Sequence, residues 1–287
     1  MTENEPITVQ VIIPVYNAGE SLAACLDSLR AQSFAAWRAI VVDDLSTDNS
    51  REIMRRYEQT DSRFLCLYNE TNSGVSRTRN RAIGELDRQI PYTAFLDSDD
   101  RWEPGTLEKL CASADKYDAD IVQCRFVYDF PGGKTVLPRG AFDREMFFER
   151  GNFKPVYRRM LTGINMNHVC MKLIRTGLLC DMRFNTSMKT AEDLELMIRL
   201  FERVKRYAFI PDVLYHYTRS GSGLTGVGLS GSEKLAANRR IARLMTDSLP
   251  GWGMDCLAYR LLARFRPYLL IVSKLFRTAR EKIKTKS

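Results

Sequence analysis

Short apolar segments that alternate with amphipathic ones are the feature that most restricts how this chain can fold. The first, residues 9–15 (VQVIIPV), is rich in β-branched residues and bounded by a turn, as expected of a buried strand. Further apolar runs lie at 39–42, 64–67, 92–96 and 121–127. Helices are expected between them: at 22–32 with Ser21 as N-cap, through Ile53, Met54 and Tyr57 after a turn at 46–50, at 76–83, and from Pro104 to Tyr117. Strands alternating with helices predict an α/β fold whose helices flank a largely parallel sheet.

The second half of the chain has a less regular pattern. It predicts a helix at 142–153, mixed strand and helix signals at 169–179, a strongly amphipathic helix at 191–204 and an extended segment at 207–217. Residues 220–232 are rich in Gly and Ser and predict a loop. The residues after this loop predict helices with basic and apolar faces. We therefore expect a body at 7–218, with halves at about 7–110 and 111–218, and an extension at 219–287.

Charge is distributed unevenly between these two parts. The 287 residues are 45% hydrophobic and 27% charged, which is typical of a globular protein and excludes a disordered chain. The formal net charge is +8, yet Lys234 to Ser287 alone holds 13 Lys and Arg against 3 Asp and Glu. Apolar residues interleave with these charges from Leu257 to Phe276 and predict an amphipathic helix on an anionic membrane surface. The alternative is a set of helices that pack on the body. No nucleic-acid-binding motif accompanies the basic residues, so we expect no nucleic-acid partner.

Three features bear on the compartment. Residues Met1 to Pro6 are polar and acidic, so we expect no secretory signal. The apolar stretch from Tyr268 to Val272 is far shorter than the roughly 20 residues that span a bilayer. The 7 cysteines are scattered and form no C-x-x-C pair, which favours a reducing compartment. We expect a cytoplasmic protein that is peripheral on the inner face of the cell membrane.

Acidic residues follow two of the predicted strands directly. Asp97-Ser98-Asp99-Asp100 follows the strand at 92–96, and Asp43-Asp44 follows the strand at 39–42. In open α/β sheets, ligands bind beyond the carboxyl ends of the strands. Alternating carboxylates such as Asp97 and Asp99 suit a hard divalent ion, because Mg²⁺ and Mn²⁺ prefer oxygen ligands. The alternative for both clusters is a solvated turn, in which Asp is common.

Other polar residues have two interpretations each. Glu192-Asp193 begins a predicted helix, so these acids either stabilise the helix terminus or supply a general base that accepts a proton from a sugar hydroxyl. His216 is either a metal or phosphate ligand or a buried, hydrogen-bonded histidine. Arginines alternate after Gly74, and we assign Arg79 to the contact with a diphosphate.

In combination, these segments resemble glycosyltransferase family 2. The matching segments are VIIPVYN (11–17), VVDDLSTDNS (41–50), GVSRTRNRAI (74–83) and FLDSDD (95–100), in the family's order and spacing across about the first hundred residues. AEDLEL (191–196) resembles the acceptor-side motif of the family. The resemblance implies a GT-A fold, a nucleotide-sugar donor, a divalent metal (Mn²⁺ or Mg²⁺) and inversion at the anomeric carbon.

The resemblance also implies a role for individual residues. Pro14, Tyr16 and Asn17 line the nucleotide, Asp44 binds the base, Asp43 supports that loop, Asp97 with Ser98 faces the ribose or the metal, Asp99 is the main metal ligand, and Asp193 is the catalytic base. Leu45 stands where the family usually has Gly, and Leu carries a steric cost wherever a positive φ is needed. The Q-x-x-R-W sequence and membrane spans of processive synthases are absent, which favours addition of a single sugar.

We therefore expect an enzyme that moves one sugar, in particular from a UDP-sugar, to a hydroxyl of a glycan or lipid-linked glycan in cell-surface polysaccharide synthesis. A sugar nucleotidyltransferase is one alternative, but it would need a glycine-rich basic loop where Pro14-Val15-Tyr16-Asn17 stands. A non-catalytic binding module that uses the basic tail is the other.

Overall fold

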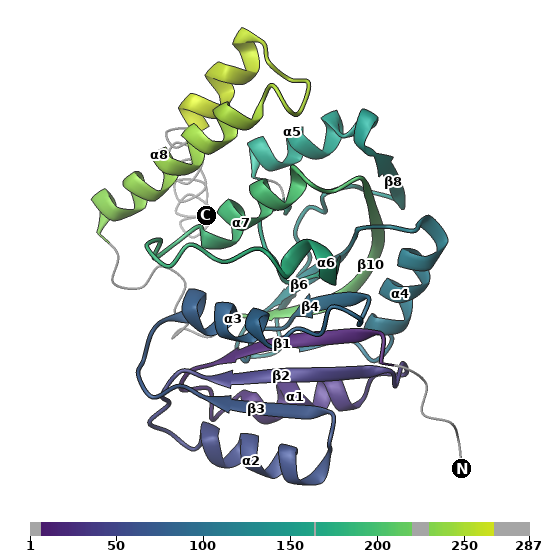
Figure 1. The fold of residues 1–287 in the computed structure, drawn as a ribbon, viewed down its shortest axis with the longest axis vertical. Helices are drawn as coiled ribbons and strands as arrows, with labels where there is room; N and C mark the ends of the chain where they lie inside the picture. The colour runs from purple at the N-terminus through teal and green to yellow at the C-terminus, as the bar shows by residue number, and fades with distance from the viewer. Residues whose placement is uncertain (1–6, 164, 220–229, 267–287) are drawn as a thin grey trace, which may run out of the picture.

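The computed structural model describes residues 7–163, 165–219 and 230–266. Within this part of the chain one ten-stranded sheet has the order β3-β2-β1-β4-β9-β6-β10-β5, with β7 paired to β6 and β8 to β10 (Figure 1). The strands are β1 (Val9–Val15), β2 (Trp37–Asp43), β3 (Phe64–Tyr68), β4 (Tyr92–Phe95), β5 (Arg101–Trp102), β6 (Ile121–Asp129), β7 (Thr135–Val136), β8 (Met146–Glu149), β9 (Lys172–Arg175) and β10 (Arg206–Thr218).

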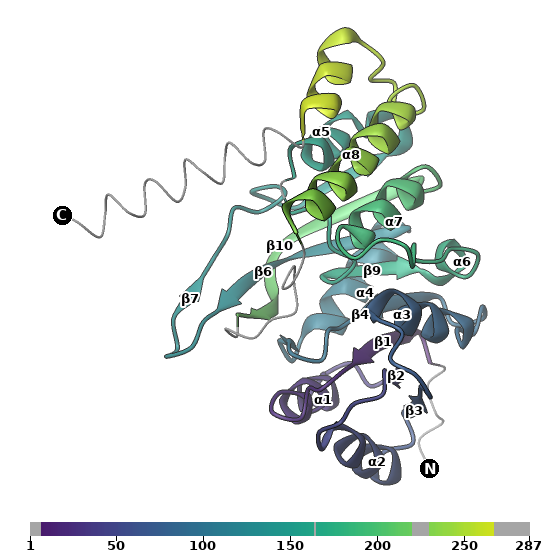
Figure 2. The same ribbon diagram turned by 90° about the vertical axis from the view of Figure 1, so that its left-hand side faces the viewer.

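Helices connect most of these strands. They are α1 (Leu22–Arg30), α2 (Ser50–Thr60), α3 (Val75–Gly84), α4 (Thr106–Tyr117), the 3-10 helix η1 (Arg150–Asn152), α5 (Lys154–Thr162), α6 (Thr176–Leu179), α7 (Glu192–Phe201) and α8 (Gly231–Ser248), followed by a helical segment at 257–266. Helices α1 and α2 cover one face of the first four strands, and α3 covers the other (Figure 2). The predicted α/β fold with helices flanking the sheet is confirmed.

Strand β1 is the centre of the parallel half of the sheet. All of its residues are buried, since it pairs in parallel with β2 and β4 and has helices on both faces. Because β1, β2 and β4 run in the same direction, the residues that follow them meet at one edge of the sheet. Asp43 and Asp97 therefore reach this edge from separate strands, as the sequence predicts.

Strand β9 brings the second half of the chain to the same place. It lies between β4 and β6 and runs antiparallel to both. On the α3 side of the sheet, Asn80 donates to the Phe184 carbonyl at 2.9 Å and accepts from the Phe184 N–H at 2.7 Å. These two bonds fix the segment that leads into α7 against α3.

The prediction of a helix at 142–153 is wrong. Met146–Glu149 forms β8 and pairs antiparallel with β10, and α5 begins only at Lys154. Phe147 stacks on Tyr117 with ring centroids 4.7 Å apart, and Phe148 is buried. Packing against neighbouring elements thus overrides the local pattern, while Pro155 in the first turn suits the start of α5.

The C-terminal extension packs on the body through α8. Ile241, Met245 and Leu249 are fully buried and belong to the same hydrophobic core as the sheet. Of the predicted loop, residues 220–229 lie outside the described residues, and Gly231 and Ser232 are helical because Ser230 and Glu233 form a capping box. The predicted tail beyond residue 266 is likewise outside the described part. Within that part no helix is long and apolar enough to cross a membrane.

Candidate active site

A cleft of about 1180 Å³ opens at the carboxyl edge of the parallel strands. One wall comes from the residues after β1 and from the start of α3. The other comes from residues 167–171, the start of α7 and the C-terminal helices. The predicted site residues that line it are Pro14, Tyr16, Asn17, Asp44, Arg79, Asp97, Ser98, Asp99 and Asp193. Residues from distant parts of the sequence thus converge on one cleft.

Arg79 is the link between the two walls. Its guanidinium is buried, donates to Asp97 Oδ1 at 2.8 Å and to Asp193 Oδ1 at 2.8 Å, and lies 3.8 Å from Glu192. Burial opposes the charge, yet the carboxylates of Asp193 and Asp97 hold the pKa of Arg79 well above its usual value. Each terminal nitrogen donates to one of these carboxylates, so Arg79 positions both of them, and its expected contact with a diphosphate stays a prediction.

A short segment before β9 holds the other oxygens of the same carboxylates. The Val169 N–H donates to Asp193 Oδ2 at 3.3 Å, and the Cys170 thiol donates to Asp97 Oδ2 at 3.4 Å. Met171 follows with a φ of 65°, which turns the chain into β9. These contacts could not be predicted from the sequence, because a backbone N–H and a lone cysteine leave no motif.

Within the acidic cluster after β4, the side chains face different surroundings. Asp97 and Asp99 line the cleft, whereas Asp100 is buried, accepts from the Tyr215 hydroxyl and from the Thr218 N–H, and so anchors β10. Burial and the neighbouring Asp97 charge raise the pKa of Asp99 to about 6. Among the described residues, no side chain donates a hydrogen bond to the Asp99 carboxylate, and no cationic side chain forms an ion pair with it.

The carboxylates of Asp97 and Asp99 suit a divalent cation that is held partly by the protein and partly by a substrate. Among the described residues no cluster of three or more His, Cys, Asp or Glu side chains is arranged to bind a metal by itself. Mg²⁺, however, is usually bound by one or two carboxylates together with water and substrate phosphates. Asp99, which has a carboxylate neighbour and no cation partner in the described part of the chain, fits such a site.

The loop after β2 is held by its two aspartates. Asp43 is fully buried, accepts from Arg51 Nε at 2.6 Å and from the Ser46 N–H, and does not line the cleft. It therefore supports the loop, as expected, and is not positioned to contact a nucleotide. Leu45 has a φ of 63°, so the turn does require the left-handed conformation that favours Gly.

Asp44 lines the cleft but already has several protein partners. It accepts hydrogen bonds from Asn69 Nδ2 at 2.7 Å, from the N–H and hydroxyl of Ser73 at about 3 Å, and from the Gly74 N–H at 2.7 Å. Burial alone would raise the pKa of Asp44, but these hydrogen bonds outweigh burial and lower it. The carboxylate thus fixes the segment 69–74 that leads into α3.

The first wall of the cleft is braced by polar contacts between loops. The Asn17 N–H donates to Ser46 Oγ at 2.9 Å, and Asn17 Oδ1 accepts from the Thr47 N–H at 2.8 Å. Ser21 precedes α1, but its hydroxyl does not accept from the helix as an N-cap would. It donates to the Ser98 carbonyl at 3.0 Å, so it ties α1 to the turn that carries Asp97 and Asp99.

His216 pairs with Arg101 across β10 and β5 and contacts a different set of side chains. Its Nδ1 is 2.8 Å from Asp129 and 2.8 Å from an Arg101 nitrogen, and its Nε2 is 2.5 Å from Glu103. It does not line the cleft. Both ring nitrogens are occupied by these neighbours, so in this arrangement they are not offered to a metal at Asp99, and the role of His216 as a metal ligand stays a prediction.

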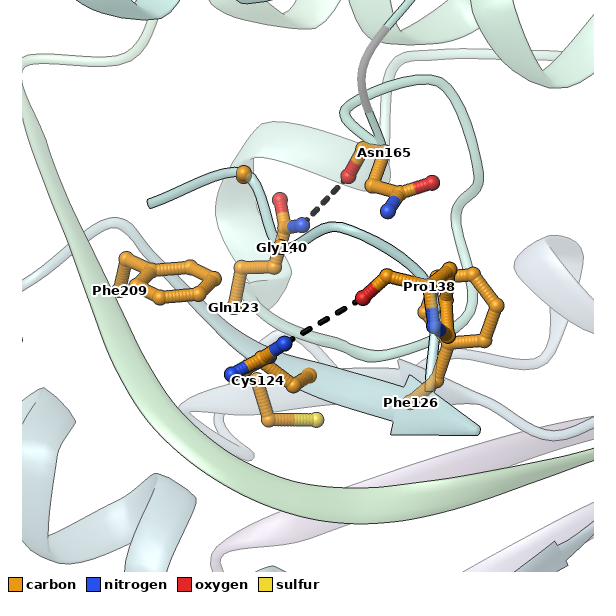
Figure 3. Close-up of a pocket in the computed structure, with 9 residues that line it drawn as sticks. Gln123, Cys124, Phe126, Pro138, Gly140, Asn165 and Phe209 are labelled. Atoms are coloured by element: carbon orange, nitrogen blue, oxygen red, sulfur yellow. Dashed lines mark hydrogen bonds between the residues drawn. The ribbon is translucent and has the colours of Figure 1, made fainter. Parts of the chain in front are cut away.

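A second hollow lies against β6, beneath residues 138–141 (Figure 3). Gln123 there donates to the Asn165 carbonyl at 2.6 Å, and Arg125 donates to the Pro138 carbonyl at 3.3 Å. The hollow has no room for a water molecule. It is a packing feature and holds no ligand.

Comparisons with known proteins show the family to which the chain belongs. The model of the family described as Glycosyl transferase family 2 matches residues 10–182. The chain is 44% identical over 109 residues to TuaG of Bacillus subtilis (strain 168), which is named for teichuronic acid biosynthesis; this match covers 38% of the chain and 42% of TuaG. It is 28% identical over 221 residues to the glycosyltransferase GlyG of Streptococcus pneumoniae, covering 75% of the chain and 72% of GlyG.

Solved structures of S. aureus TarS 1-349 have a similar fold. The free form superposes with a TM-score of 0.71 at 25% identity and covers 90% of this chain and 72% of that one. The complex with UDP superposes with a TM-score of 0.67 at 25% identity, with coverages of 83% and 65%. The chain thus spans less than half of TuaG and about two thirds of the UDP-bound structure.

Proposed function

Because the chain belongs to glycosyl transferase family 2, we propose that it transfers one sugar from a UDP-sugar to a hydroxyl of a glycan or lipid-linked glycan acceptor, with inversion of the anomeric carbon. The observation that carries this proposal is the pair of 2.8 Å bonds from Arg79 to Asp97 and Asp193. They set a donor-side carboxylate and an acceptor-side carboxylate at a fixed spacing across one cleft.

The donor occupies the wall formed by the loops after β1 and β2. Pro14, Tyr16 and Asn17 line the nucleotide there, and Asp44 holds the segment 69–74 beside the base. Asp97 and Ser98 are at the end of β4, next to the ribose. The binding of UDP by the similar TarS 1-349 supports uracil as the base.

Asp99, with Asp97 beside it, would hold Mn²⁺ or Mg²⁺ against the diphosphate. Such an ion acts as a Lewis acid and neutralises the charge that develops on the leaving group. Its charge would also suit Asp99, whose pKa is raised by burial and by the neighbouring Asp97 charge.

Asp193 acts as the general base. Arg79 and the Val169 N–H hold one oxygen each, so the carboxylate is oriented on the cleft wall opposite the nucleotide. An acceptor hydroxyl that donates to Asp193 loses its proton during attack on the anomeric carbon, and attack from the face opposite the leaving group inverts it.

The extension attaches the enzyme to the inner face of the cell membrane. Leu257 and Leu261 are 72% and 43% exposed and lie one turn apart on the helical segment 257–266. Exposed leucines on a basic helix suit an anionic lipid surface, where a lipid-linked acceptor would be found. Relatives named for surface polymers, such as TuaG, support a role in surface polysaccharide synthesis.

A donor panel assayed by nucleotide release tests the function. Purified full-length protein is incubated with UDP-sugars and GDP-sugars, with and without Mn²⁺, in the presence of a hydroxyl-rich acceptor mixture. We expect UDP release from at least one UDP-sugar that depends on Mn²⁺ or Mg²⁺. Release of pyrophosphate from sugar phosphate and UTP would indicate a nucleotidyltransferase, and no turnover with any donor would contradict the proposal.

A further inference from the structure

Arg266 is a buried charge that the proposed chemistry does not use. It comes from the helical segment 257–266, is 4% exposed and lines the cleft. Its Nε donates to the Leu161 carbonyl at 3.2 Å. Within the described residues, no carboxylate pairs with it and its two terminal nitrogens have no hydrogen-bond partner.

A buried guanidinium without a counter-charge is unfavourable, because removal of a charge from water costs several kcal/mol. Burial accordingly lowers the pKa of Arg266 to about 10. Arg79, the other buried arginine of this cleft, is compensated by the carboxylates of Asp97 and Asp193. The difference points to an external anion as the partner of Arg266.

The position of Arg266 places this anion on the acceptor side. Leu161 belongs to α5, and the chain continues from there into the wall that contains Asn167 and Val169, next to Asp193. Asn167 also lines the cleft, and its side-chain oxygen is buried without a hydrogen-bond partner among the described residues. An unused acceptor and an unused cation therefore face the same cleft, outside the loops that would hold the nucleotide.

We propose that Arg266 binds an oxyanion of the acceptor substrate, a phosphate or a carboxylate, while Asn167 accepts a hydrogen bond from a hydroxyl of the same molecule. The inference rests on the proposed function, since it takes this side of the cleft to be the acceptor side. A fork of N–H donors suits either anion, because both present two oxygens in one plane.

The test measures binding of small probes to the full-length protein saturated with UDP and Mn²⁺, so that nucleotide sites are filled. Titrations with glycerol 1-phosphate, glucuronate and glucose separate phosphate, carboxylate and neutral ligands. We expect one of the two anions to bind and glucose to bind at least about tenfold more weakly, as expected for a charge-assisted pair. R266Q should lower the affinity for the anion by at least about tenfold and leave the affinity for UDP unchanged.

Two further variants keep the test decisive. R264Q removes an exposed arginine from the same helical segment and should bind the anion as the wild type does. R266K keeps the charge if R266Q does not fold, and we expect it to bind the anion more weakly than wild type.

Equal anion binding by wild type and the position-266 variant, no anion binding by wild type, or a loss of UDP affinity alone would overturn the inference. If wild type failed to bind UDP, the proposed function would fail. The anion titration without nucleotide would then still decide the role of Arg266.

Discussion

Asp97 and Asp193 accept hydrogen bonds of 2.8 Å from the two terminal nitrogens of one guanidinium, that of Arg79. Asp97 follows β4 and Asp193 begins α7, so this shared donor fixes the distance between the two walls of the cleft. Their other oxygens are held by Cys170 and Val169. Both carboxylates are therefore oriented before any substrate binds, which removes reorganisation from the reaction.

Replacement of Arg79 by lysine tests this arrangement. Lysine keeps the positive charge but lacks the planar fork, so one ammonium cannot serve both carboxylates in the same geometry. We expect R79K to lower kcat for transfer by roughly 10- to 100-fold, the size of effect that a small misplacement of catalytic groups produces. R77K, at an exposed position of the same helix, is the control and should keep wild-type kcat. An R79K enzyme with full kcat would show that the shared contact is unimportant.

The sequence predicts the positions of the acids better than it predicts what holds them. Asp97 and Asp99 follow a buried strand, and strand ends meet at one edge of the sheet, so their convergence follows from the pattern. Asp193 follows from the resemblance of the motif around it. The contacts of Val169 and Arg266 could not be predicted, because they depend on how β9 and the C-terminal helices pack against the first half.

Two features that the local sequence pattern does not predict have the same origin. The helix predicted at 142–153 does not form because β8 pairs with β10, and the ring nitrogens of His216 contact Glu103 and Asp129 because of the position of β10. In both cases local sequence suggests a role, and the tertiary neighbours determine the outcome.

Asp193→Asn tests the proposed base. Asparagine has nearly the same shape and keeps one acceptor oxygen, which can replace the bond to Arg79 or the bond to the Val169 N–H but not both. Its amide cannot take a proton at neutral pH. We expect transfer to fall by roughly 10²- to 10⁴-fold, the usual contribution of a general base, while UDP affinity stays close to that of the wild type. Measurement of kcat for UDP release and of UDP binding separates the two effects. E192Q should lose much less activity, and an equal loss would transfer the role of base to Glu192.

Leu45→Gly should stabilise the protein. Leu45 has a φ of 63° and a side chain that is 36% exposed, so the substitution removes strain and little burial. The left-handed conformation costs a non-glycine residue about 1–2 kcal/mol, and the extra freedom of glycine in the unfolded chain cancels about 0.4–1 kcal/mol of that gain.

We expect the free energy of unfolding in urea to rise by about 0.5–1 kcal/mol for L45G. Leu65, which is 38% exposed and lies in β3, provides the matched comparison. L65G should destabilise the protein, because glycine weakens a strand. A loss of stability in L45G as large as that in L65G would mean that Leu45 makes contacts that outweigh its strain.

Because Lys172 is buried, we expect the stability of the protein to depend on pH. Lys172 is 1% exposed in β9, and its ammonium donates to the His168 carbonyl. Burial lowers the pKa of Lys172 from 10.5 to about 8, although the nearby Asp193 charge opposes the shift. Between these two pH values the unfolded chain binds more protons at this residue than the folded chain does, so the free energy of unfolding rises with pH.

K172M removes this titration. The contribution of Lys172 is complete above its unfolded pKa and is lost as pH falls through about 8. The free energy of unfolding of the wild type minus that of K172M should therefore increase by about 2 kcal/mol from pH 7 to pH 9.5. Urea unfolding of both proteins at matched pH values measures this difference, in which groups common to both cancel. A difference that stays constant or falls across this range would mean that Lys172 keeps an ordinary pKa in the folded protein.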